Sequence, residues 1–446
     1  MAVAQHGLHN TGQEIFGAES MFDTLIWITV AVCISGALLA YVQSRDVFHP
    51  ALLLSTLCLF VYVYLPYQLL HSEELFTYVT TEQALFAQTL VILGLVSLFL
   101  GLLLGSTSRA HTRTHVMFST VLVQHGAYWI GAIGFLAWLF TIQNAGGLVA
   151  TYSRAYSSGW SEYGYIRDAV YLLLVALLLL LSPEGYARRT WRWTLSVAAF
   201  AVPWLAQAIL GARRGPTFVL FLTIGMSWYL ARRTRPPLML ALSVGIGVGL
   251  LMLFLVSNRG SIYIGSDLES LDFNVAETVT SASAANEYIF GVGCITTAKQ
   301  VGYFYWGRRY LAQVLVRPIP RQLWPNKYAD VGLEALEYNA GVALPGMESI
   351  MGWSEVPGAA AAMIADLWVE FSWGFLPVLL GIGYMYSRTW RLAVEQGGAW
   401  STQFVILCAL SVYLVTQSGE AVIFRLVILS LPTWYVWRRA RIPAAA

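Results

Sequence analysis

Charge is scarce in this sequence. Only 11% of the 446 residues are Asp, Glu, Lys or Arg, whereas a soluble domain carries roughly 25%. Hydrophobic residues make up 57% of the chain. This balance excludes an ordinary soluble globular protein and predicts a chain that lies mostly in lipid.

The signatures of several soluble enzyme classes are also missing. The chain has no GxxxxGK, GxSxG or HExxH motif, which argues against a cytosolic nucleotide-binding enzyme and a zinc hydrolase. Its four cysteines are single and widely spaced, so no disulfide framework or CxxC metal site is expected. The acidic run at 265–272 has no specific metal-ligand spacing. We therefore expect neither a metal nor a cofactor.

What the sequence has instead is a series of apolar runs, each roughly 16 to 28 residues long. In hydrocarbon such runs must be helices, because every backbone polar group has to be paired internally. They predict an all-α, polytopic integral membrane protein with about 11 transmembrane helices, in which residues 1–446 form a single transmembrane domain. The runs are 22–41, 50–70, 84–104, 121–140, 165–181, 193–210, 216–230, 238–256, 359–386, 400–415 and 421–437.

The placement of arginine predicts the topology. Loops rich in Lys and Arg stay in the cytoplasm during insertion, and six basic segments each follow an odd-numbered run. The N-terminus is therefore expected outside and the C-terminus in the cytoplasm, with no cleavable signal peptide. These segments hold 14 of the 26 cations: Arg45; Arg109 and Arg113; Arg188, Arg189 and Arg192; Arg232, Arg233 and Arg235; Arg388 and Arg391; Arg438, Arg439 and Arg441.

A long external loop, residues 257–358, is expected between the eighth and ninth helices. Its first part is acidic, but residues 288–329 contain no acid while six cations and several aromatic residues accumulate there. This mixture suits sugar rings that stack on aromatic faces beside anionic groups held by guanidinium. The alternative is an ordinary interfacial belt lying on lipid headgroups.

Basic residues in unusual places are the candidates for substrate binding. Arg213 and Arg214, in GARRGP, open the seventh helix on the external side, where Arg259 leaves the eighth. Two forked guanidiniums at headgroup depth can grip a lipid diphosphate, or they can simply anchor the helix to headgroups. The proline-rich segment RPIPRQLWPNK predicts a rigid extended turn, whose candidates are Arg317, Arg321, Lys327 and Trp324.

The acids in the later helices are the candidates for proton transfer. Asp366 and Glu370 are four residues apart and therefore share one helix face. Carboxylates in an apolar helix are costly and normally face a polar cavity or a cation. Because all seven histidines lie at or before His125, a base in this region must be acidic. Glu370 is the first candidate and Asp366 the second, with an ion pair that packs the bundle as the alternative.

The last predicted helix carries two further charged residues. Glu420 and Arg425 each need an internal partner. For this pair a salt bridge between helices is as well supported as a catalytic role, and Arg425 is a further candidate for substrate binding.

The motifs GARRGP, PIPRQLWPNK and WVEFSWGF on a many-helix chain resemble the Wzy-type oligosaccharide repeat unit polymerases of bacteria. The resemblance implies a metal-independent glycosyltransferase at the outer face of the cytoplasmic membrane. It would move a glycan from polyprenyl diphosphate onto the next lipid-linked repeat unit. The implied partners are polyprenyl-diphosphate-linked oligosaccharides, membrane lipids, a chain-length regulator and a flippase, with no nucleic acid. The implied site residues are Arg213, Arg214, Arg317, Arg321, Lys327 and Glu370.

Two other functions stay open. An O-antigen ligase would transfer glycan from the same donor to a lipid A core, but ligases that look similar carry a histidine in the external loop, and this chain has none there. A transporter or flippase of lipid-linked sugars would also place cations in a membrane cavity. Such proteins tend to show paired repeats with broken helices, and the sequence shows no duplication.

Overall fold

The described part of the chain is helical throughout. Its helices are joined by turns, and these residues contain no β-strand beyond a single bridge between Phe118 and Arg441. This confirms the predicted all-α class for that part of the chain. The structure, a computed structural model, describes residues 3–107, 117–153, 164–211, 213–232, 234–258, 261–265, 286–333, 344–354 and 359–442.

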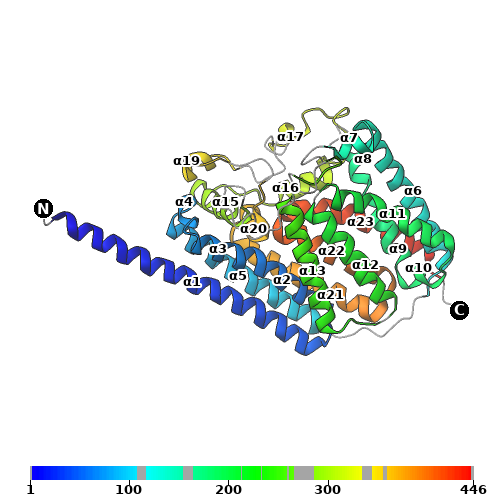
Figure 1. Cartoon of the computed structure of the whole chain (residues 1–446), viewed down its shortest axis with the longest axis horizontal. Helices are drawn as coiled ribbons and strands as arrows, with labels where there is room; N and C mark the ends of the chain where they lie inside the picture. Colours follow the sequence, from blue (N-terminus) through cyan, green and yellow to red (C-terminus); the bar gives the residue numbers. More distant parts are fainter. Residues whose placement is uncertain are drawn as a thin grey trace.

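The helices follow one another in the order shown in Figure 1. The first half contains α1 (Val3–Ser44), α2 (Pro50–Leu59), η1 (Phe60–Tyr64), α3 (Leu65–His71), α4 (Leu75–Tyr78), α5 (Thr81–Thr107), α6 (Thr120–Asn144), α7 (Leu148–Tyr152), α8 (Gly164–Ala169), α9 (Leu172–Leu180), α10 (Pro183–Ala187), α11 (Trp191–Ile209) and α12 (Arg214–Ala231). The second half contains α13 (Leu238–Ser257), α15 (Glu287–Val301), α16 (Arg308–Leu311), η3 (Ala312–Val316), α17 (Lys327–Asp330), α19 (Met347–Met351), α20 (Ala362–Phe371), η4 (Ser372–Gly374), α21 (Phe375–Gln396), α22 (Gly398–Thr416) and α23 (Gly419–Ala440).

In the part of the chain that the structure describes, seven helical stretches are long and apolar enough to cross a membrane. They support the predicted membrane-embedded helical protein, because a span needs about 20 apolar residues. The seven are Glu19–Ser44, Pro50–His71, Thr81–Thr107, Thr120–Asn144, Ala362–Gln396, Gly398–Thr416 and Gly419–Ala440.

The other four predicted spans are helical, but each is split, contains a proline or has a shorter apolar stretch. The run at 165–181 is split between α8 and α9, and α9 has only 9 residues, about 14 Å of helix against a hydrocarbon core of roughly 30 Å. Pro203 lies inside α11. The apolar stretches in α12 and α13 are the shorter Gly215–Ala231 and Leu238–Met252. The count of about eleven spans therefore stays a prediction.

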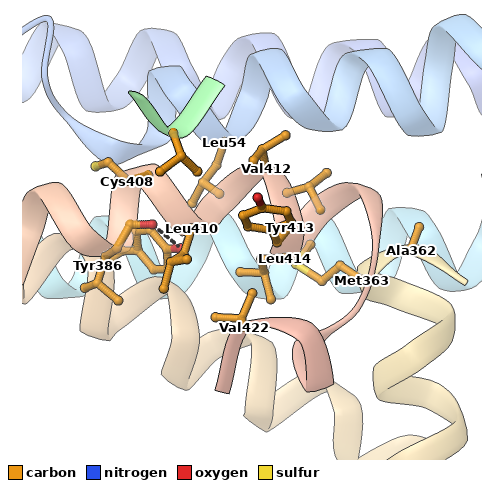
Figure 2. Close-up of a cluster of buried hydrophobic side chains, with 14 of the residues drawn as sticks. Leu54, Ala362, Met363, Tyr386, Cys408, Leu410, Val412, Tyr413, Leu414 and Val422 are labelled. Atoms are coloured by element: carbon orange, nitrogen blue, oxygen red, sulfur yellow. Dashed lines mark hydrogen bonds between the residues drawn. The ribbon is translucent and has the colours of Figure 1, made fainter. Parts of the chain in front are cut away.

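Two helices form the centre of the bundle. Every residue of α22 except Trp400 is buried, and α22 packs against α2, α12, α20, α21 and α23. Figure 2 shows side chains of this core, including Leu54 of α2, Val422 of α23 and Tyr386 of α21, whose hydroxyl donates to the Leu407 carbonyl at 3.0 Å. Helix α9 is likewise apolar all round, because other helices enclose it.

Glycine allows α5 and α21 to pack with their backbones in contact. A Cβ atom on Gly101 would come within 2.0 Å of the Leu380 carbonyl oxygen. One on Gly383 would come within 2.1 Å of the Leu98 carbonyl oxygen. Such close approach through small residues is typical of helix pairs in membranes.

The basic segments gather at one end of the bundle. Arg235 donates to Asp46 at 2.8 Å, and the second oxygen of Asp46 accepts from Trp390 at 3.2 Å. Arg391 donates to the Ser106 carbonyl at 3.3 Å. Segments that are far apart in sequence, and that we predict to be cytoplasmic, therefore lie together.

The long region between α13 and α20 lies mostly at the opposite end, on the upper side of Figure 1 with α7 and α8. It is less of a loop than the sequence suggests, because residues 288–298 of α15 are buried in the bundle. Tyr288 donates to Gln88 of α5 at 2.9 Å, and Gln88 donates in turn to Thr29 of α1 at 2.8 Å. The region predicted as an external loop, 257–358, thus contains a helix, α15, that packs into the bundle, and its external location stays a prediction.

Candidate functional site

A fully buried arginine from this region lies at the centre of the candidate site. Arg309 follows Gly307 in the first turn of α16 and has no exposed surface. Its guanidinium meets three carboxylates: Nε donates to Glu370 at 2.5 Å, Nη2 donates to Asp366 at 2.5 Å, and Nη1 lies 3.4 Å from Glu420. We call these four residues the Arg309 cluster.

Asp366 and Glu370 do share one helix face, as their spacing predicts. Both are buried in α20, and both bind the same guanidinium. The oxygen of Glu370 that does not bind Arg309 accepts from the Gly307 backbone N–H at 2.7 Å. Both carboxylates therefore have cationic or amide donors already in place, which is the arrangement of an ion pair that packs the bundle.

A break in the predicted helix at 359–386 explains how Arg309, from the region between α13 and α20, comes to be buried beside α20. The predicted helix at 359–386 is interrupted at Ser372, whose φ is 49°. The carbonyls left open at the end of α20 accept from Tyr305 N–H at 3.1 Å (Val369 oxygen) and Trp306 N–H at 2.6 Å (Glu370 oxygen). Residues 305–307 thus cap α20 and bring Arg309 to its carboxylates. Trp306 holds a strained positive φ of 52° to do so.

The second oxygen of Asp366 is bound from two further elements. It accepts from the Tyr310 hydroxyl at 2.5 Å and from the Gly419 N–H, at the start of α23, at 2.8 Å. Burial raises the pKa of Tyr310 and the charge of Asp366 raises it further, so the phenol stays a donor. A Cβ at position 419 would lie 2.6 Å from the Tyr310 oxygen, so a larger residue there would require the Tyr310 side chain or the start of α23 to shift.

Glu420 is held less tightly than the other two acids. One of its oxygens accepts from the Gln313 amide, and in the described chain the other has the 3.4 Å contact with Arg309.

With all three acids ionised, the Arg309 cluster would carry a net charge of −2. Burial lowers the pKa of Arg309, but the three carboxylates raise it by more, so its pKa lies well above the usual value. Arg309 is therefore permanently charged.

One glutamine side chain links the Arg309 cluster to a second group of arginines. The Gln313 oxygen accepts from Arg317 at 3.0 Å. Arg317 also pairs with Asp168 of α8 at 2.8 Å, and its guanidinium lies 3.9 Å from the centre of the Phe424 ring. Residues 309, 313 and 317 are spaced by four, so α16 and η3 present all three to α20 and α23.

Arg425 is the least compensated cation near this link. Its Nε donates to the Tyr171 hydroxyl at 2.7 Å, Nη1 donates to the Ala421 carbonyl, and the guanidinium lies 4.4 Å from the centre of the Tyr413 ring. Among the residues that the structure describes, no carboxylate lies within ion-pair distance of Arg425. In the described chain, this half-buried guanidinium thus has its direct contacts with hydroxyl, carbonyl and aromatic groups, while Asp168 acts on it from beyond ion-pair distance.

The start of α12 approaches the same aromatic ring. Arg213 caps α12, and a Cβ on Gly215 would lie 2.6 Å from the Tyr413 hydroxyl. Arg213 also interacts electrostatically with Tyr152 of α7, where it opposes the rise in pKa that burial causes. We call Arg213, Arg317 and Arg425 the arginine site. The side chain of Arg214 and all of Arg259 lie outside the described residues.

The proline-rich segment forms turns, as predicted, but Lys327 binds backbone carbonyls of the same turn. Lys327 is buried, and its Nζ donates to the carbonyls of Val316, Arg317 and Ile319 at 3.2, 2.9 and 2.6 Å. An ammonium has three donors, and all three are used. Burial lowers the pKa of Lys327, and the nearby Arg321 and Arg317 lower it further. In this conformation Lys327 fixes the turn instead of presenting a free cation to a substrate.

The other two candidates of this segment are more accessible. Arg321 is exposed, and its charge is felt by Lys327 and Tyr328. Trp324 is half-buried and donates from Nε1 to Asp330 at 2.6 Å. Both therefore lie close to residues of α17.

The structure brings most of the sequence candidates to one end of the bundle but divides them into two groups. Arg213, Arg317 and Arg425 form the arginine site, whereas Asp366 and Glu370 bind Arg309. Sequence reasoning missed Arg309 and Gln313 as site residues. Their signal is the 309/313/317 spacing in a stretch without acids, which could have been matched to the unpaired acids of the following helices.

No protein-family model, curated protein or solved structure matches this sequence. Among the described residues, no group of three or more His, Cys, Asp or Glu side chains is arranged to hold a metal ion. The function is therefore inferred from the arginine site and the Arg309 cluster.

Proposed function

We propose that this protein is a membrane glycosyltransferase that uses a polyprenyl-diphosphate-linked glycan as donor and a lipid-linked oligosaccharide repeat unit as acceptor. The observation that carries the proposal is Arg425, a half-buried guanidinium with no carboxylate of the described chain in ion-pair range. Cations held within a membrane protein normally have a partner. A diphosphate would supply it.

The chemistry of the arginine site suits that ligand. A guanidinium binds phosphate oxygens through two parallel hydrogen bonds, and it stays charged at every physiological pH. Asp168 lies near both Arg317 and Arg425, and Glu420 is a second carboxylate near Arg317. Fixed cations of this kind would stabilise the charge that develops on the leaving diphosphate. Arg213, at the start of α12, would extend the site toward the donor lipid.

The proposal includes the topology. The end of the bundle that carries the arginine site would face outward from a bacterial cytoplasmic membrane, with about eleven spans, the N-terminus outside and the C-terminus in the cytoplasm. Support comes from the gathering of the basic segments at the opposite end. A chain-length regulator and a flippase are the expected protein partners.

The test is transfer by the purified protein. Reconstituted in lipid nanodiscs and given polyprenyl-diphosphate-linked repeat units, with a chelator and no nucleotide, the protein should produce a ladder of lengthened lipid-linked glycans. An absolute requirement for a divalent ion or nucleotide would contradict the arginine-based chemistry. Failure to bind the donor at all would remove the proposal.

The same assay separates the two alternatives. A ligase would lengthen no lipid-linked chain but would move glycan to an added lipid A core. A transporter would leave glycan length unchanged and, in liposomes, would move lipid-linked sugar from one leaflet to the other.

A further inference from the structure

Three acids surround Arg309, and they do not have equal roles. Asp366 accepts from three donors and Glu370 accepts from two, each at 2.8 Å or less. Glu420 has one short donor and one contact of 3.4 Å. The weakly held oxygen of Glu420 therefore keeps the most capacity for a further donor such as a hydroxyl.

Position also sets Glu420 apart. The side chains of Asp366 and Glu370 are 0% exposed, whereas 8% of the Glu420 side chain is exposed. Glu420 lies in the first turn of α23, one helical turn before Phe424 and Arg425. Through Gln313 it is also linked to Arg317. It is thus the acid of the cluster that borders the arginine site.

The charge balance of the cluster favours the same residue. The cluster has one guanidinium for three carboxylates, and an uncompensated charge is costly in a low-dielectric interior. Arg309 donates to Asp366 and to Glu370 at 2.5 Å, whereas its contact with Glu420 is 3.4 Å long. A carboxylate beside a substrate site that is only weakly held by its cation can accept the proton of a hydroxyl, which is what general-base catalysis needs.

We propose that Glu420 is the general base of the transfer reaction, and that Asp366 and Glu370 are positioning residues that hold Arg309 beside it. This inference rests on the glycosyl transfer proposed above, and it moves the basic role from Glu370 to Glu420. The charged and titratable groups around Glu420 are Arg309 of α16, Asp366 and Glu370 of α20, Arg317 after η3, and Tyr328 of α17.

The acceptor hydroxyl gives its proton to the Glu420 carboxylate, and the oxygen uses the freed electron pair to form a bond with the anomeric carbon of the donor glycan. The bond from that carbon to the phosphate oxygen breaks, and its electrons leave with the diphosphate, whose charge Arg317 and Arg425 compensate. Glu420 then releases its proton to water, which restores the carboxylate.

The decisive variant is Glu420→Gln, which keeps the shape and removes the basicity. In the nanodisc assay its kcat should fall by about 100- to 10,000-fold, while donor binding and thermal stability stay close to wild type. Wild-type activity should also fall at low pH as the base becomes protonated, and this acid limb should vanish from the residual activity of the variant. The matched control is Glu395→Gln, at the opposite end of α21 beside Arg391, which should retain full activity.

A second variant covers the case in which Glu420→Gln does not fold. Glu420→Asp keeps a carboxylate but withdraws it by one methylene, so activity should fall by about tenfold and the acid limb should persist at a shifted pH. An unchanged kcat in Glu420→Gln, or an unshifted acid limb in Glu420→Asp, would overturn the assignment. If these results accompany normal transfer by the wild type, only the base is wrong. If the wild type transfers no glycan, the proposed function falls and this inference falls with it.

Discussion

The Arg309 cluster and the arginine site use the same side-chain chemistry in opposite proportions. In the cluster, three carboxylates surround one guanidinium that has no exposed surface. In the arginine site, Asp168 is the carboxylate near both Arg317 and Arg425. Only a few residues along α23 separate Glu420 from Arg425.

The difference shows that the partners of a buried cation indicate whether it stabilises the fold or can bind a ligand. A cation enclosed by acids is already neutralised, so it holds elements of the fold together and has little left for a ligand. A cation held by hydroxyl, carbonyl and aromatic groups keeps its charge available for an anion that comes later. Substitutions in each group of residues test this distinction.

Arg309→Met should have the largest effect on stability. Removing the guanidinium leaves three buried carboxylates without a cation, and breaking a buried pair in this way costs about 3–5 kcal/mol. The thermal midpoint of the purified protein should drop sharply, or the protein should fail to accumulate in the membrane. Arg308→Met is the control: this neighbour is exposed, and the change should cost less than about 1 kcal/mol.

A combined variant sharpens this prediction. If Arg309 serves the fold by neutralising the acids, then Arg309→Met together with Asp366→Leu and Glu370→Met should recover much of the lost stability, because an apolar cluster of similar volume needs no cation. Equal instability of the single and triple variants would show that shape, and not charge, holds the cluster.

Arg425→Gln should weaken anion binding and leave the fold intact. It removes a charged donor from the arginine site, where a charge-assisted hydrogen bond is worth about 1.5–3 kcal/mol, so affinity for a polyprenyl diphosphate should fall by roughly 10- to 150-fold. Binding can be followed by calorimetry in nanodiscs. Arg391→Gln, at the opposite end of the bundle, is the control. Loss of stability without loss of affinity would make Arg425 a structural residue.

Gly419→Ala should disturb the cluster through space alone. The new methyl would lie 2.6 Å from the Tyr310 oxygen and 3.3 Å from Asp366, and overpacking of this kind costs about 1–3 kcal/mol. Gly381→Ala in α21 is the matched control, since nothing lies within 4 Å of its Cβ position. Thermal unfolding of both variants measures the difference, and equal midpoints would show that α23 moves away without cost.

Lys327→Met should have the smallest effect on stability, about 1 kcal/mol, because the turn loses its ammonium donors while part of it can still be hydrated. We expect the segment between η3 and α17 to be cleaved faster by a protease. Donor affinity should fall only slightly, because Arg317 is displaced with the turn. A large, direct loss of affinity with an intact turn would return Lys327 to the substrate-binding residues.

Much of the fold follows from the sequence because lipid leaves so few options. Apolar runs such as Thr81–Thr107 must be helical, and the arginine segments mark one end of the bundle. The break at Ser372 could not be predicted, since nothing local demands a positive φ in FSWG. The burial of α15 was missed for a similar reason: residues such as Tyr288 and Cys294 are buried by distant helices.

The candidate site was predictable in its parts but not in its pairing. The spacing of Asp366 and Glu370 indicates a shared face, and the cost of acids in lipid indicates that a cation is needed. The cation is Arg309, which lies 57 positions before Asp366 and 61 positions before Glu370. A contact between residues so far apart cannot be inferred from a single sequence. For Lys327 the sequence shows a cation in a basic turn but not its acceptors, because the carbonyls of Val316, Arg317 and Ile319 reach it only once the turn has folded.

The cap that residues 305–307 place on α20 has a consequence for biogenesis. The open carbonyls at the end of α20 would lie bare in the bilayer if the helix were inserted alone. Their donors, however, come earlier in the chain, so they have already left the ribosome when α20 is synthesised. Vectorial synthesis thus delivers the partner before the helix that needs it, and a circular permutation that reversed this order would have to insert α20 with its last turn incomplete.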